Sequence, residues 1–482
     1  MLDPSILREY DIRGVVGRTL DTAVARMIGL AFGTMAAERG IGTVCVGYDG
    51  RLSAPSLESA LVDGLVASGR DVVRIGRGPT PMLYFTLFER GIAAGVMVTG
   101  SHNPPDHNGF KLLLNRTPLR PDEIRRIGTI AARGNFACGR GVVRDLDVRD
   151  AYVARLAAEV RRGHPLKVAW DTGNGAAGEI VHALAARLDG THLILNGAID
   201  GTFPAHHPDP AVPRNLRQLQ KAVVESGCDA GLAFDGDGDR IGLIDETGAI
   251  LWPDQTLLFL ARAVLREHPG APIIADVKSS QVLFDGIAAS GGRPVMAPSG
   301  YTCLQRAMRE HGAPLAGEMS GHIFFADRYH GVDDALYCAV RILSVLAESG
   351  QSLAAFRAGL PKVANTPELR IACPEARRRD IVTEVASRLR RSGAQMNDID
   401  GVRVRREHGW WLLRASNTEA ALAARCEAHD PAGLDRLIRE LVAQLAASGI
   451  DAPELAEARR SHALRGGDQE FSELLAGSLD RA

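Results

Sequence analysis

Three carboxylates stand at alternate positions in one short stretch of the chain. Residues 235–240 read D-G-D-G-D-R, so single glycines separate Asp235, Asp237 and Asp239. Three anions this close repel one another, and a bound cation removes that repulsion. The two glycines let the backbone curl until the three side chains converge. Because all the ligand atoms are oxygens, the loop favours a hard ion such as Mg²⁺.

Two alternatives compete with this interpretation: a calcium-binding EF-hand and a solvated acidic turn. The three aspartates and Glu246 fall at the first, third, fifth and twelfth positions of an EF-hand loop. The sixth position of such a loop requires glycine, whereas this chain has Arg240 there. The residues before the loop also read as a strand rather than a helix. We therefore favour magnesium.

A second loop presents a serine among turn-forming residues. Residues 99–111 read T-G-S-H-N-P-P-D-H-N-G-F-K and follow the apolar run 93–98, which we expect to be a buried strand. Glycine, proline and asparagine recur in the loop, and we expect non-regular backbone there, including at Asn103, Asn108 and Gly109. Ser101 should therefore lie at the carboxyl end of a strand, where ligand sites gather in α/β sheets. A plain surface turn is the alternative.

Together these strings resemble the α-D-phosphohexomutases, most of all their phosphomannomutase/phosphoglucomutase branch. The resemblance implies that Ser101 carries a phosphoryl group in the resting enzyme and both donates and accepts it. The phosphate on Ser101 would then join the three aspartates as a metal ligand. His102 and Lys111 flank the serine as candidates for charge stabilisation and proton transfer, and Arg240 would help to hold phosphate.

Two further segments match motifs of this family. Residues 8–14 read R-E-Y-D-I-R-G, which implies that Arg13 reaches the phosphoserine and Tyr10 lines the cleft. The planar fork of an arginine binds phosphate oxygens in pairs. Residues 317–322 read G-E-M-S-G-H, the sugar-binding loop, in which Glu318 and Ser320 would bind sugar hydroxyls. His322 is a candidate for proton transfer because imidazole titrates near neutral pH.

A phosphate-binding segment and one departure from the family complete the predicted site. The run R-A-S-N-T-E after a predicted strand offers a phosphate cradle, formed by Arg414, Ser416, Asn417 and Thr418. The resemblance also places Lys278 at the cleft. Where the branch often has a glycine-histidine step, this chain has Gly300 followed by Tyr301. A tyrosine can still donate to the sugar ring but cannot become a cation near neutral pH, so the sugar preference stays open.

Alternating strand and helix patterns predict an α/β protein. We expect three tandem α/β domains of similar plan, with mixed sheets, and a smaller C-terminal α+β domain, all around a central cleft. The predicted bounds are 1–148 for the phosphoserine domain, 149–250 for the metal-binding domain, 251–360 for the sugar-binding domain, 361–455 for the phosphate-binding domain and 456–482 for a tail of unknown role. Gly359 and Pro361 suggest a hinge before the last domain.

The length, net charge and cysteine content of the chain limit the kinds of function that it can have. A chain of 482 residues exceeds what one hydrophobic core organises. Its net charge of -2 favours neither a nucleic acid nor a membrane as partner. Neither a signal peptide nor an apolar run of membrane-spanning length is visible, and the seven cysteines include no C-x-x-C pair. We expect a cytoplasmic protein with reduced thiols, acting on small-molecule hexose phosphates as a monomer or dimer.

The predicted activity is the reversible interconversion of hexose 1-phosphate and hexose 6-phosphate. The resemblance implies that it proceeds through the phosphoserine and a hexose 1,6-bisphosphate intermediate, which also acts as activator. A phosphoglucosamine mutase, a sugar phosphatase using the same serine and metal, and a silent sugar-phosphate-binding protein are the alternatives. The sequence leaves open whether the sugar is mannose, glucose or glucosamine, and which residue is the general acid and which the general base.

Overall fold

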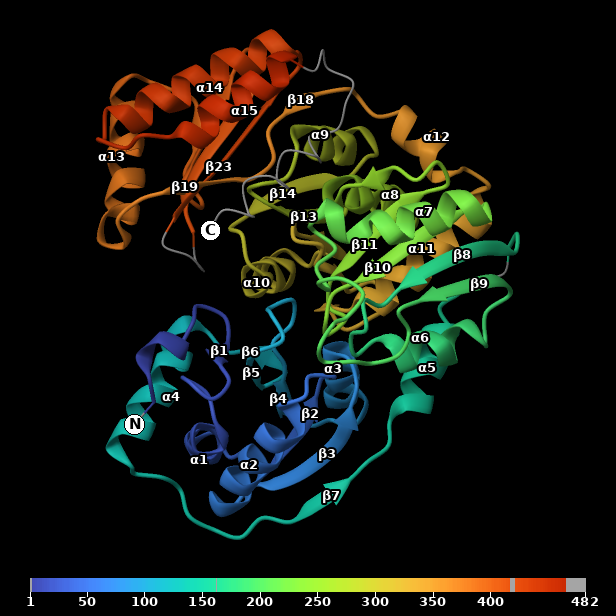
Figure 1. Cartoon of the computed structure of the whole chain (residues 1–482), viewed down its shortest axis with the longest axis vertical. Coiled ribbons are helices and arrows are strands. Elements are labelled where there is room, and N and C mark those ends of the chain that lie inside the picture. The colour runs from blue at the N-terminus through green and yellow to red at the C-terminus, as the bar shows by residue number, and fades with distance from the viewer. Residues whose placement is uncertain (1, 162, 417–420, 465–482) are drawn as a thin grey trace. The chain divides into compact units, whose positions relative to one another are not determined.

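The computed structural model describes residues 2–161, 163–416 and 421–464, and the description below is confined to them. The chain forms two compact units. The first contains the residues up to Ile274 together with 287–293 and 300–358. The second contains 275–286, 294–299 and the chain from Gly359 onwards. Figure 1 labels most of the elements named below.

The first domain is built on a mixed sheet with the strand order β1-β5-β4-β2-β3-β7, to which β6 adds by pairing with β5. Strands β4, β2, β3 and β7 run parallel, whereas β5 is antiparallel to both β4 and β1. The elements are β1 (Ile12–Val15), α1 (Thr22–Glu38), β2 (Thr43–Tyr48), α2 (Ala54–Ala67), β3 (Asp71–Arg77), α3 (Thr80–Glu89), β4 (Ala94–Val98), β5 (His107–Leu114), β6 (Thr117–Pro118), α4 (Pro121–Arg133) and β7 (Val143–Asp145).

Two glycines let helices α1 and α2 approach each other closely. A Cβ atom on Gly29 would lie 2.2 Å from the Leu61 carbonyl oxygen, and one on Gly64 would lie 2.2 Å from the Arg26 carbonyl oxygen. Larger side chains would hold the two backbones apart. Residues of both helices, among them Phe32, join the main hydrophobic core of the domain.

The expectation of non-regular backbone at Asn108 and Gly109 is wrong, because both residues belong to β5. Gly109 is paired with Arg13 of β1, and a Cβ atom at Gly109 would lie 2.1 Å from the Ile12 carbonyl oxygen. The glycine therefore serves close strand pairing rather than a turn. Asn108 donates from its side chain to the Ser53 hydroxyl at 2.9 Å, which explains a polar residue in a buried strand.

The second domain carries a sheet of order β12-β11-β10-β8-β9, and the third a sheet of order β14-β13-β15-β16-β17. In the second, β8 runs parallel to both β9 and β10, and β10 is antiparallel to β11. Its elements are α5 (Arg149–Ala157), β8 (Leu166–Asp171), α6 (Gly178–Ala185), β9 (Gly190–Leu195), α7 (Arg217–Ser226), β10 (Ala230–Phe234), β11 (Ile241–Asp245) and β12 (Ile250–Leu251). Those of the third are α8 (Pro253–Glu267), β13 (Pro272–Asp276), α9 (Gln281–Ala289), β14 (Arg293–Ala297), α10 (Tyr301–His311), β15 (Leu315–Gly317), β16 (Ile323–Phe325), β17 (Val332–Asp333), α11 (Ala335–Ser349) and α12 (Leu353–Ala358).

The C-terminal part packs helices on one antiparallel sheet of order β18-β23-β22-β21-β20, with β19 paired to β23. Its core gathers Trp411, Leu413, Leu437 and other apolar side chains. A separate small cluster of Val277, Met296, Trp410 and Leu412 ties the segments 275–286 and 294–299 to this sheet. The elements are β18 (Ala364–Asn365), β19 (Leu369–Ala372), α13 (Arg378–Arg391), β20 (Met396–Asn397), β21 (Val402–Arg406), β22 (Gly409–Ala415), β23 (Ala421–Ala428), α14 (Pro431–Ala446) and α15 (Pro453–Leu464).

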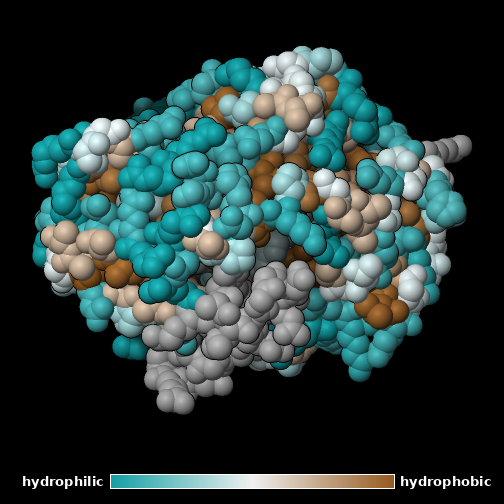
Figure 2. Space-filling view, turned by 90° about the horizontal axis from the view of Figure 1, so that it is seen from above, coloured by the Kyte–Doolittle hydropathy of each residue, from teal (hydrophilic) through white to brown (hydrophobic). Residues whose placement is uncertain are grey.

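The predicted fold class, α/β domains with mixed sheets followed by a smaller α+β domain, is confirmed. The stretch after Asp451, for which the sequence indicated only a charged, alanine-rich tail, begins with the helix α15. No helix in the described part of the chain combines the length and apolar character needed to cross a bilayer. The face seen in Figure 2 is largely hydrophilic, with hydrophobic residues in small groups.

Candidate active site

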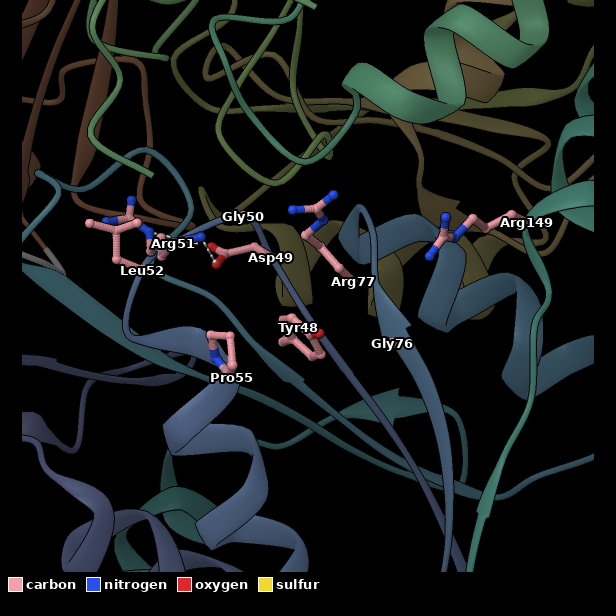
Figure 3. Close-up of a pocket in the computed structure, with 9 residues that line it drawn as sticks. All are labelled: Tyr48, Asp49, Gly50, Arg51, Leu52, Pro55, Gly76, Arg77 and Arg149. Atoms are coloured by element: carbon pink, nitrogen blue, oxygen red, sulfur yellow. Dashed lines mark hydrogen bonds and ion pairs between the residues drawn. The ribbon is translucent and has the colours of Figure 1, made fainter. Parts of the chain in front are cut away.

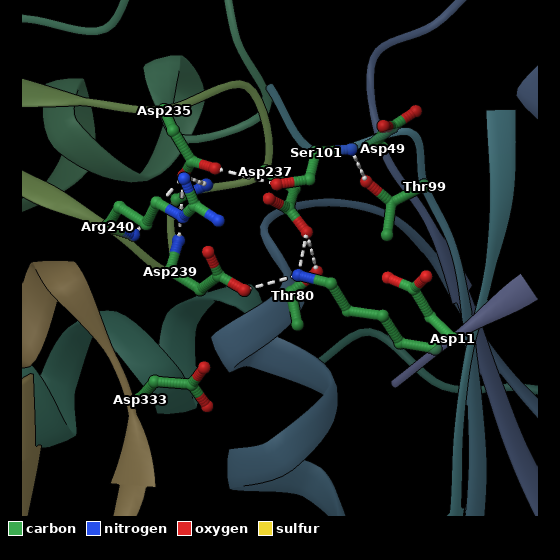
Figure 4. Close-up of polar contacts among 12 residues, drawn as sticks. Asp11, Asp49, Thr80, Thr99, Ser101, Asp235, Asp237, Asp239, Arg240 and Asp333 are labelled. Atoms are coloured by element: carbon green, nitrogen blue, oxygen red, sulfur yellow. Dashed lines mark hydrogen bonds and ion pairs between the residues drawn. The ribbon is translucent and has the colours of Figure 1, made fainter. Parts of the chain in front are cut away.

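Ser101 follows strand β4 directly and is held in a buried, unusual backbone conformation. Its side chain is only 1% exposed, and its φ of +49° lies in the left-handed region. Such a conformation in a non-glycine residue persists only where the surroundings enforce it, and it is typical of functional sites. The Ser101 hydroxyl donates to Asp235 Oδ2 at 2.9 Å (Figure 4). Its oxygen also lies 3.1 Å from Nδ1 of His102. The structure thus brings together the serine and the first aspartate of the acidic loop.

The acidic loop follows strand β10 and curls around the carboxylate of Asp235. Asp235 Oδ1 accepts hydrogen bonds from the backbone N–H groups of Gly238, Asp239 and Arg240 at 3.0, 3.1 and 3.2 Å. The three aspartates each offer an oxygen within 4.8 Å of the others, and all three are buried. Burial raises the pKa of Asp235 well above its usual range, and the charges of Asp239 and Asp237 raise it further.

Lys111, from strand β5, neutralises the two other aspartates. Its Nζ lies 2.6 Å from Asp237 Oδ2 and also contacts Asp239. Burial alone would lower the pKa of Lys111, but the charges of Asp237 and Asp239 raise it, and the net pKa lies well above its usual value. For Asp237, burial would raise the pKa, yet Lys111 holds it below the usual range. A hydrogen bond from the Thr80 hydroxyl, 2.5 Å long, adds to this effect.

The residues of this loop fit a hard divalent cation. Asp237 Oδ1 and Asp239 Oδ1 are buried and, within the described part of the chain, have no hydrogen-bond partner. A buried carboxylate oxygen without a partner is costly, and a metal ion would satisfy it. The donors are all oxygens, which suits Mg²⁺ and similar ions. The acidic cluster is therefore a candidate metal site.

His322 lies just before β16, with its two ring nitrogens facing opposite charges. Nε2 accepts a hydrogen bond from Arg240 Nε at 3.0 Å, and Nδ1 lies 3.0 Å from Asp333 Oδ2. An acceptor role for Nε2 places the ring proton on Nδ1, which faces Asp333. Burial raises the pKa of Asp333, whereas its contact with His322 opposes that rise. Asp333 is buried at the end of β17 and was not among the predicted site residues.

The other predicted residues of the sugar-binding loop surround His322. Glu318 is 9% exposed, and its backbone N–H donates to the His322 carbonyl at 2.9 Å. The Ser320 hydroxyl oxygen is buried and has no hydrogen-bond partner within the described residues. Gly321 accepts a hydrogen bond from the Ile241 N–H at 3.1 Å. That bond joins the predicted sugar-binding loop to the strand that follows the acidic loop.

Arg13 reaches the serine loop through a neighbour of the serine rather than through Ser101 itself. Its Nη1 donates to Asn103 Oδ1 at 2.9 Å, and its Nε donates to Asp11 Oδ2 at 2.8 Å. The Tyr301 hydroxyl donates to the Tyr10 carbonyl at 3.0 Å, and the two rings meet edge to face at 5.8 Å. The predicted residues of the first and third domains therefore lie in one connected network.

The environment of His102 keeps this imidazole neutral. Burial lowers its pKa well below the usual value, and the nearby guanidinium groups of Arg240 and Arg13 lower it further. The one hydrogen of the Ser101 hydroxyl is donated to Asp235, so the hydroxyl oxygen can accept a hydrogen bond from a neutral His102 ring protonated on Nδ1, 3.1 Å away.

A second group of predicted residues lies in the second compact unit. Lys278 Nζ is 3.3 Å from Glu368 Oε2 and 3.7 Å from Asp276 Oδ2. Arg414 Nε donates to Asp400 Oδ2 at 3.0 Å, and Ser416 is buried beside it in the chain. Burial would raise the pKa of Glu368, but Lys278, Arg370 and Arg414 lower it to about 2. Asn417 and Thr418 lie outside the described residues.

Sequence reasoning missed four residues around the serine and the acidic loop: Asp49, Arg51, Thr80 and Asp333. Asp49 and Arg51 follow strand β2 as Ser101 follows β4, and this strand-end position of a charged pair was the available signal. Thr80 begins α3 and Asp333 ends β17, and neither stands in a motif. Thr80 contacts Asp237 of the second domain, and Asp333 contacts His322 within the third, so the fold rather than a motif brings these pairs together.

Comparison with known proteins places the chain in a family. Models described as phosphoglucomutase/phosphomannomutase match in four successive parts, namely alpha/beta/alpha domain I at residues 4–137, domain II at 150–248, domain III at 252–363 and the C-terminal domain at 368–444. The chain therefore belongs to the phosphoglucomutase/phosphomannomutase family. The expected family and enzyme class, an intramolecular phosphotransferase, are confirmed.

Individual relatives agree with this assignment. A phosphomannomutase/phosphoglucomutase of Pseudomonas aeruginosa is 41% identical over 436 residues, which cover 90% of this chain and 94% of that protein. A phosphoglucomutase of Neisseria meningitidis is 40% identical, with 90% of this chain and 95% of that protein covered. A solved structure of a phosphoglucomutase/phosphomannomutase family protein from Burkholderia thailandensis matches with a TM-score of 0.89 at 41% identity, covering 94% of this chain and all of that one.

Proposed function

We propose that this protein interconverts hexose 1-phosphates and hexose 6-phosphates, with mannose and glucose as the sugars, and that Ser101 carries the phosphoryl group between the two positions. The observation that supports this most directly is the placement of the Ser101 hydroxyl, buried and 2.9 Å from an aspartate of the candidate metal site. A relative at 41% identity is named as a mutase for both sugars, and another at 40% as a mutase for glucose. Glucosamine phosphate remains the competing substrate.

In the proposed reaction, phospho-Ser101 gives its phosphoryl group to the free hydroxyl of the bound sugar phosphate. The serine O–P bond breaks and a bond from phosphorus to the sugar oxygen forms. The sugar hydroxyl gives up its proton, the Ser101 oxygen takes up a proton, and a hexose 1,6-bisphosphate results. The bisphosphate then reorients, and its other phosphate returns to Ser101. Added hexose 1,6-bisphosphate would activate the enzyme by rephosphorylating any serine that has lost its phosphate.

The residues around Ser101 would have separate roles in proton transfer and charge stabilisation. We assign His322 Nε2 as the acceptor for the sugar hydroxyl proton, because it is the unprotonated nitrogen of this ring; the sugar hydroxyl would replace Arg240, whose Nε donates to it at 3.0 Å. Lys111 and Arg13 would stabilise the charge on the transferring group. Bound by the three aspartates and the phosphorylated Ser101, Mg²⁺ would neutralise the negative charge that builds up on the phosphoryl oxygens.

The second compact unit would bind the phosphate that does not react. Lys278, Arg414 and Ser416 offer two cations and a hydroxyl in this unit, and Asn417 and Thr418 belong to the same proposed set. Glu318, Ser320, Tyr10 and Tyr301 would contact the sugar. All seven cysteines are thiols, which suits the reducing cytoplasm, the compartment that we propose.

Intact mass and a coupled assay on the purified protein test this proposal. A fraction of the protein about 80 Da heavier, absent from Ser101→Ala along with all turnover, is the expected result. Ser56→Ala, which removes an exposed helix hydroxyl that donates to the Ser53 carbonyl at 3.0 Å, is the matched control and should change neither. Mannose, glucose and glucosamine 1-phosphates would be compared with Mg²⁺ and a trace of the matching bisphosphate. Inorganic phosphate as the only product would show a phosphatase instead, and a preference for glucosamine would show the other mutase branch.

A further inference from the structure

The side chain of Arg51 is buried between the serine loop and its own strand end. It lies three residues after the end of β2 and is 1% exposed. The Asp49 carboxylate accepts from the Arg51 backbone N–H at 3.0 Å, and Asp49 Oδ2 lies 3.3 Å from Arg51 Nε. Figure 3 shows this pair at the edge of a pocket that Arg77 and Arg149 also line. A buried arginine is retained only where its hydrogens find acceptors.

The acceptors of Arg51 are four backbone carbonyls of the serine loop. Nη2 donates to the carbonyls of Ser101 and Asn103 at 2.8 and 2.6 Å. Nη1 donates to the carbonyls of Pro104 and His107 at 2.5 and 2.8 Å. A guanidinium carries four hydrogens on its two Nη atoms, so these bonds use all of them. Arg51 is therefore committed to the loop backbone, with no Nη hydrogen left to bind a phosphate.

Asp49 holds the other side of the same serine. Its Oδ2 accepts from the Gly100 backbone N–H at 3.2 Å, so the pair bonds one backbone group just before Ser101 and the carbonyl of Ser101 itself. A Cβ atom on Gly100 would lie 2.5 Å from Arg51 Cζ, which shows that the loop packs directly on the guanidinium. The Phe203 ring, from the second domain, lies 5.2 Å from Arg51 Cζ and covers it.

We propose that Asp49 and Arg51 are positioning residues that set the place of the Ser101 hydroxyl for phosphoryl transfer, acting through the backbone of the loop. The positive φ of Ser101 is a conformation that the chain resists, and the two side chains bond the groups that flank it. Phosphoryl transfer depends on alignment of the reacting oxygen, and a misplacement of about 1 Å costs on the order of 100-fold in rate. This role rests on the proposed function of Ser101. A purely stabilising arginine would affect unfolding but leave kcat unchanged.

The test is Arg51→Lys, with Arg77→Lys as the matched control. A lysine keeps the charge but offers three donors from one nitrogen, which cannot reach four carbonyls spread over the loop. Arg77 lines the same pocket and carries the same change, but its guanidinium pairs with Glu179 rather than with the serine loop. We expect Arg51→Lys to lower kcat by about 10- to 100-fold with KM within about threefold. In the control Arg77→Lys, kcat and KM should both stay within about twofold of the wild-type values.

Two further readouts separate positioning from general damage. Amide hydrogen exchange in residues 99–107 should rise in Arg51→Lys while exchange elsewhere stays at the wild-type level. The ³¹P resonance of the phosphoserine should shift or broaden in Arg51→Lys alone. Wild-type kcat in Arg51→Lys, or a loss of protection spread over the whole first domain, would overturn the proposal. The wild type is examined first, and a wild-type protein without a ³¹P phosphoserine signal would refute the proposed function. The hydrogen-exchange measurement would still decide whether Arg51 holds the serine loop.

Asp49→Asn keeps the proposal falsifiable if Arg51→Lys fails to fold. The amide retains one carbonyl acceptor of nearly the same shape but removes the charge that faces Arg51 Nε. We expect a smaller fall in kcat than in Arg51→Lys, again with KM nearly constant and increased exchange confined to residues 99–107. A folded Asp49→Asn variant with unchanged kcat and unchanged exchange would contradict the role assigned to the pair.

Discussion

Replacing Lys111 by methionine should make the stability of the protein depend strongly on Mg²⁺. Lys111 is buried and contacts two carboxylates, with its Nζ 2.6 Å from Asp237 Oδ2 and in contact with Asp239. Methionine keeps most of the side-chain volume but removes the charge. Without metal, the two carboxylates would then be buried without a compensating cation, which typically costs about 3–5 kcal/mol.

The expected size of the effect follows from this loss. The first compact unit is larger than the domains of about 150–250 residues that shift by roughly 2–4 °C per kcal/mol, so each kcal/mol should shift its melting midpoint by roughly 1–2 °C. The variant should therefore melt roughly 3–10 °C below the wild type in EDTA. Mg²⁺ supplies the missing positive charge. At a concentration one hundred times its Kd, it should raise the free energy of unfolding of the variant by about 2.7 kcal/mol. In the wild type the ion must compete with the Lys111 ammonium group, so its stabilising effect should be smaller.

Calorimetry with EDTA and with saturating Mg²⁺ measures both quantities. Lys221→Met is the matched control, because Lys221 is largely exposed and makes only a surface pair with Glu225 at 3.8 Å. Such pairs contribute about 0–1 kcal/mol, so the control should follow the wild type in both buffers. A Lys111→Met variant that melts with the wild type in EDTA would refute the charge balance inferred for the acidic loop. So would an equal Mg²⁺ response in both proteins.

Three other variants test separate features of the chain. The pKa of Glu368 is lowered to about 2, so its contribution to stability is present above its unfolded pKa of about 4.5 and is lost as pH falls toward 2. In urea titrations, Glu368→Gln should lower the free energy of unfolding by on the order of 3 kcal/mol at pH 7. The difference in stability between variant and wild type should vanish in acid. A difference that stays constant with pH would contradict the role assigned to Glu368. Gly300→Ala should raise KM, because the new Cβ would lie 2.4 Å from the Tyr10 hydroxyl and Gly300 has a φ of +123°. Steady-state kinetics with an unchanged KM would argue against Tyr10 as a substrate contact. Gly29→Ala forces helices α1 and α2 apart and should cost about 1–3 kcal/mol in urea unfolding, while an unchanged midpoint would show that the helices can shift.

Much of the candidate site could be predicted because its functional residues lie close together in short sequence motifs. The acidic loop needs its three aspartates and two glycines in one stretch, and the serine loop places Ser101 directly after an apolar strand. Alternation of apolar and polar segments likewise predicted the α/β domains. These features are local, so residue types and spacing reveal them.

The features that the sequence did not reveal depend on distant contacts. Nothing near Lys111 in the chain shows that it will bridge Asp237 and Asp239, more than a hundred residues away. Arg51 reads as an ordinary loop arginine until the carbonyls of the serine loop surround it. Asn108 and Gly109 have the composition of a turn, yet pairing with β1 outweighs that local preference.

The interleaving of the two compact units has a consequence for the order in which the chain can fold during its synthesis. Segment 275–286 belongs to the second unit, where Val277 packs with Trp410 and Leu412. The Arg403 side chain donates to the Val277 and Ser279 carbonyls, at 2.7 and 2.8 Å. A ribosome adds residues at about 5–20 per second, so this segment waits on the order of ten seconds for its partners. The nascent chain must keep these apolar residues shielded during that interval, and this is where we expect a chaperone to be needed most.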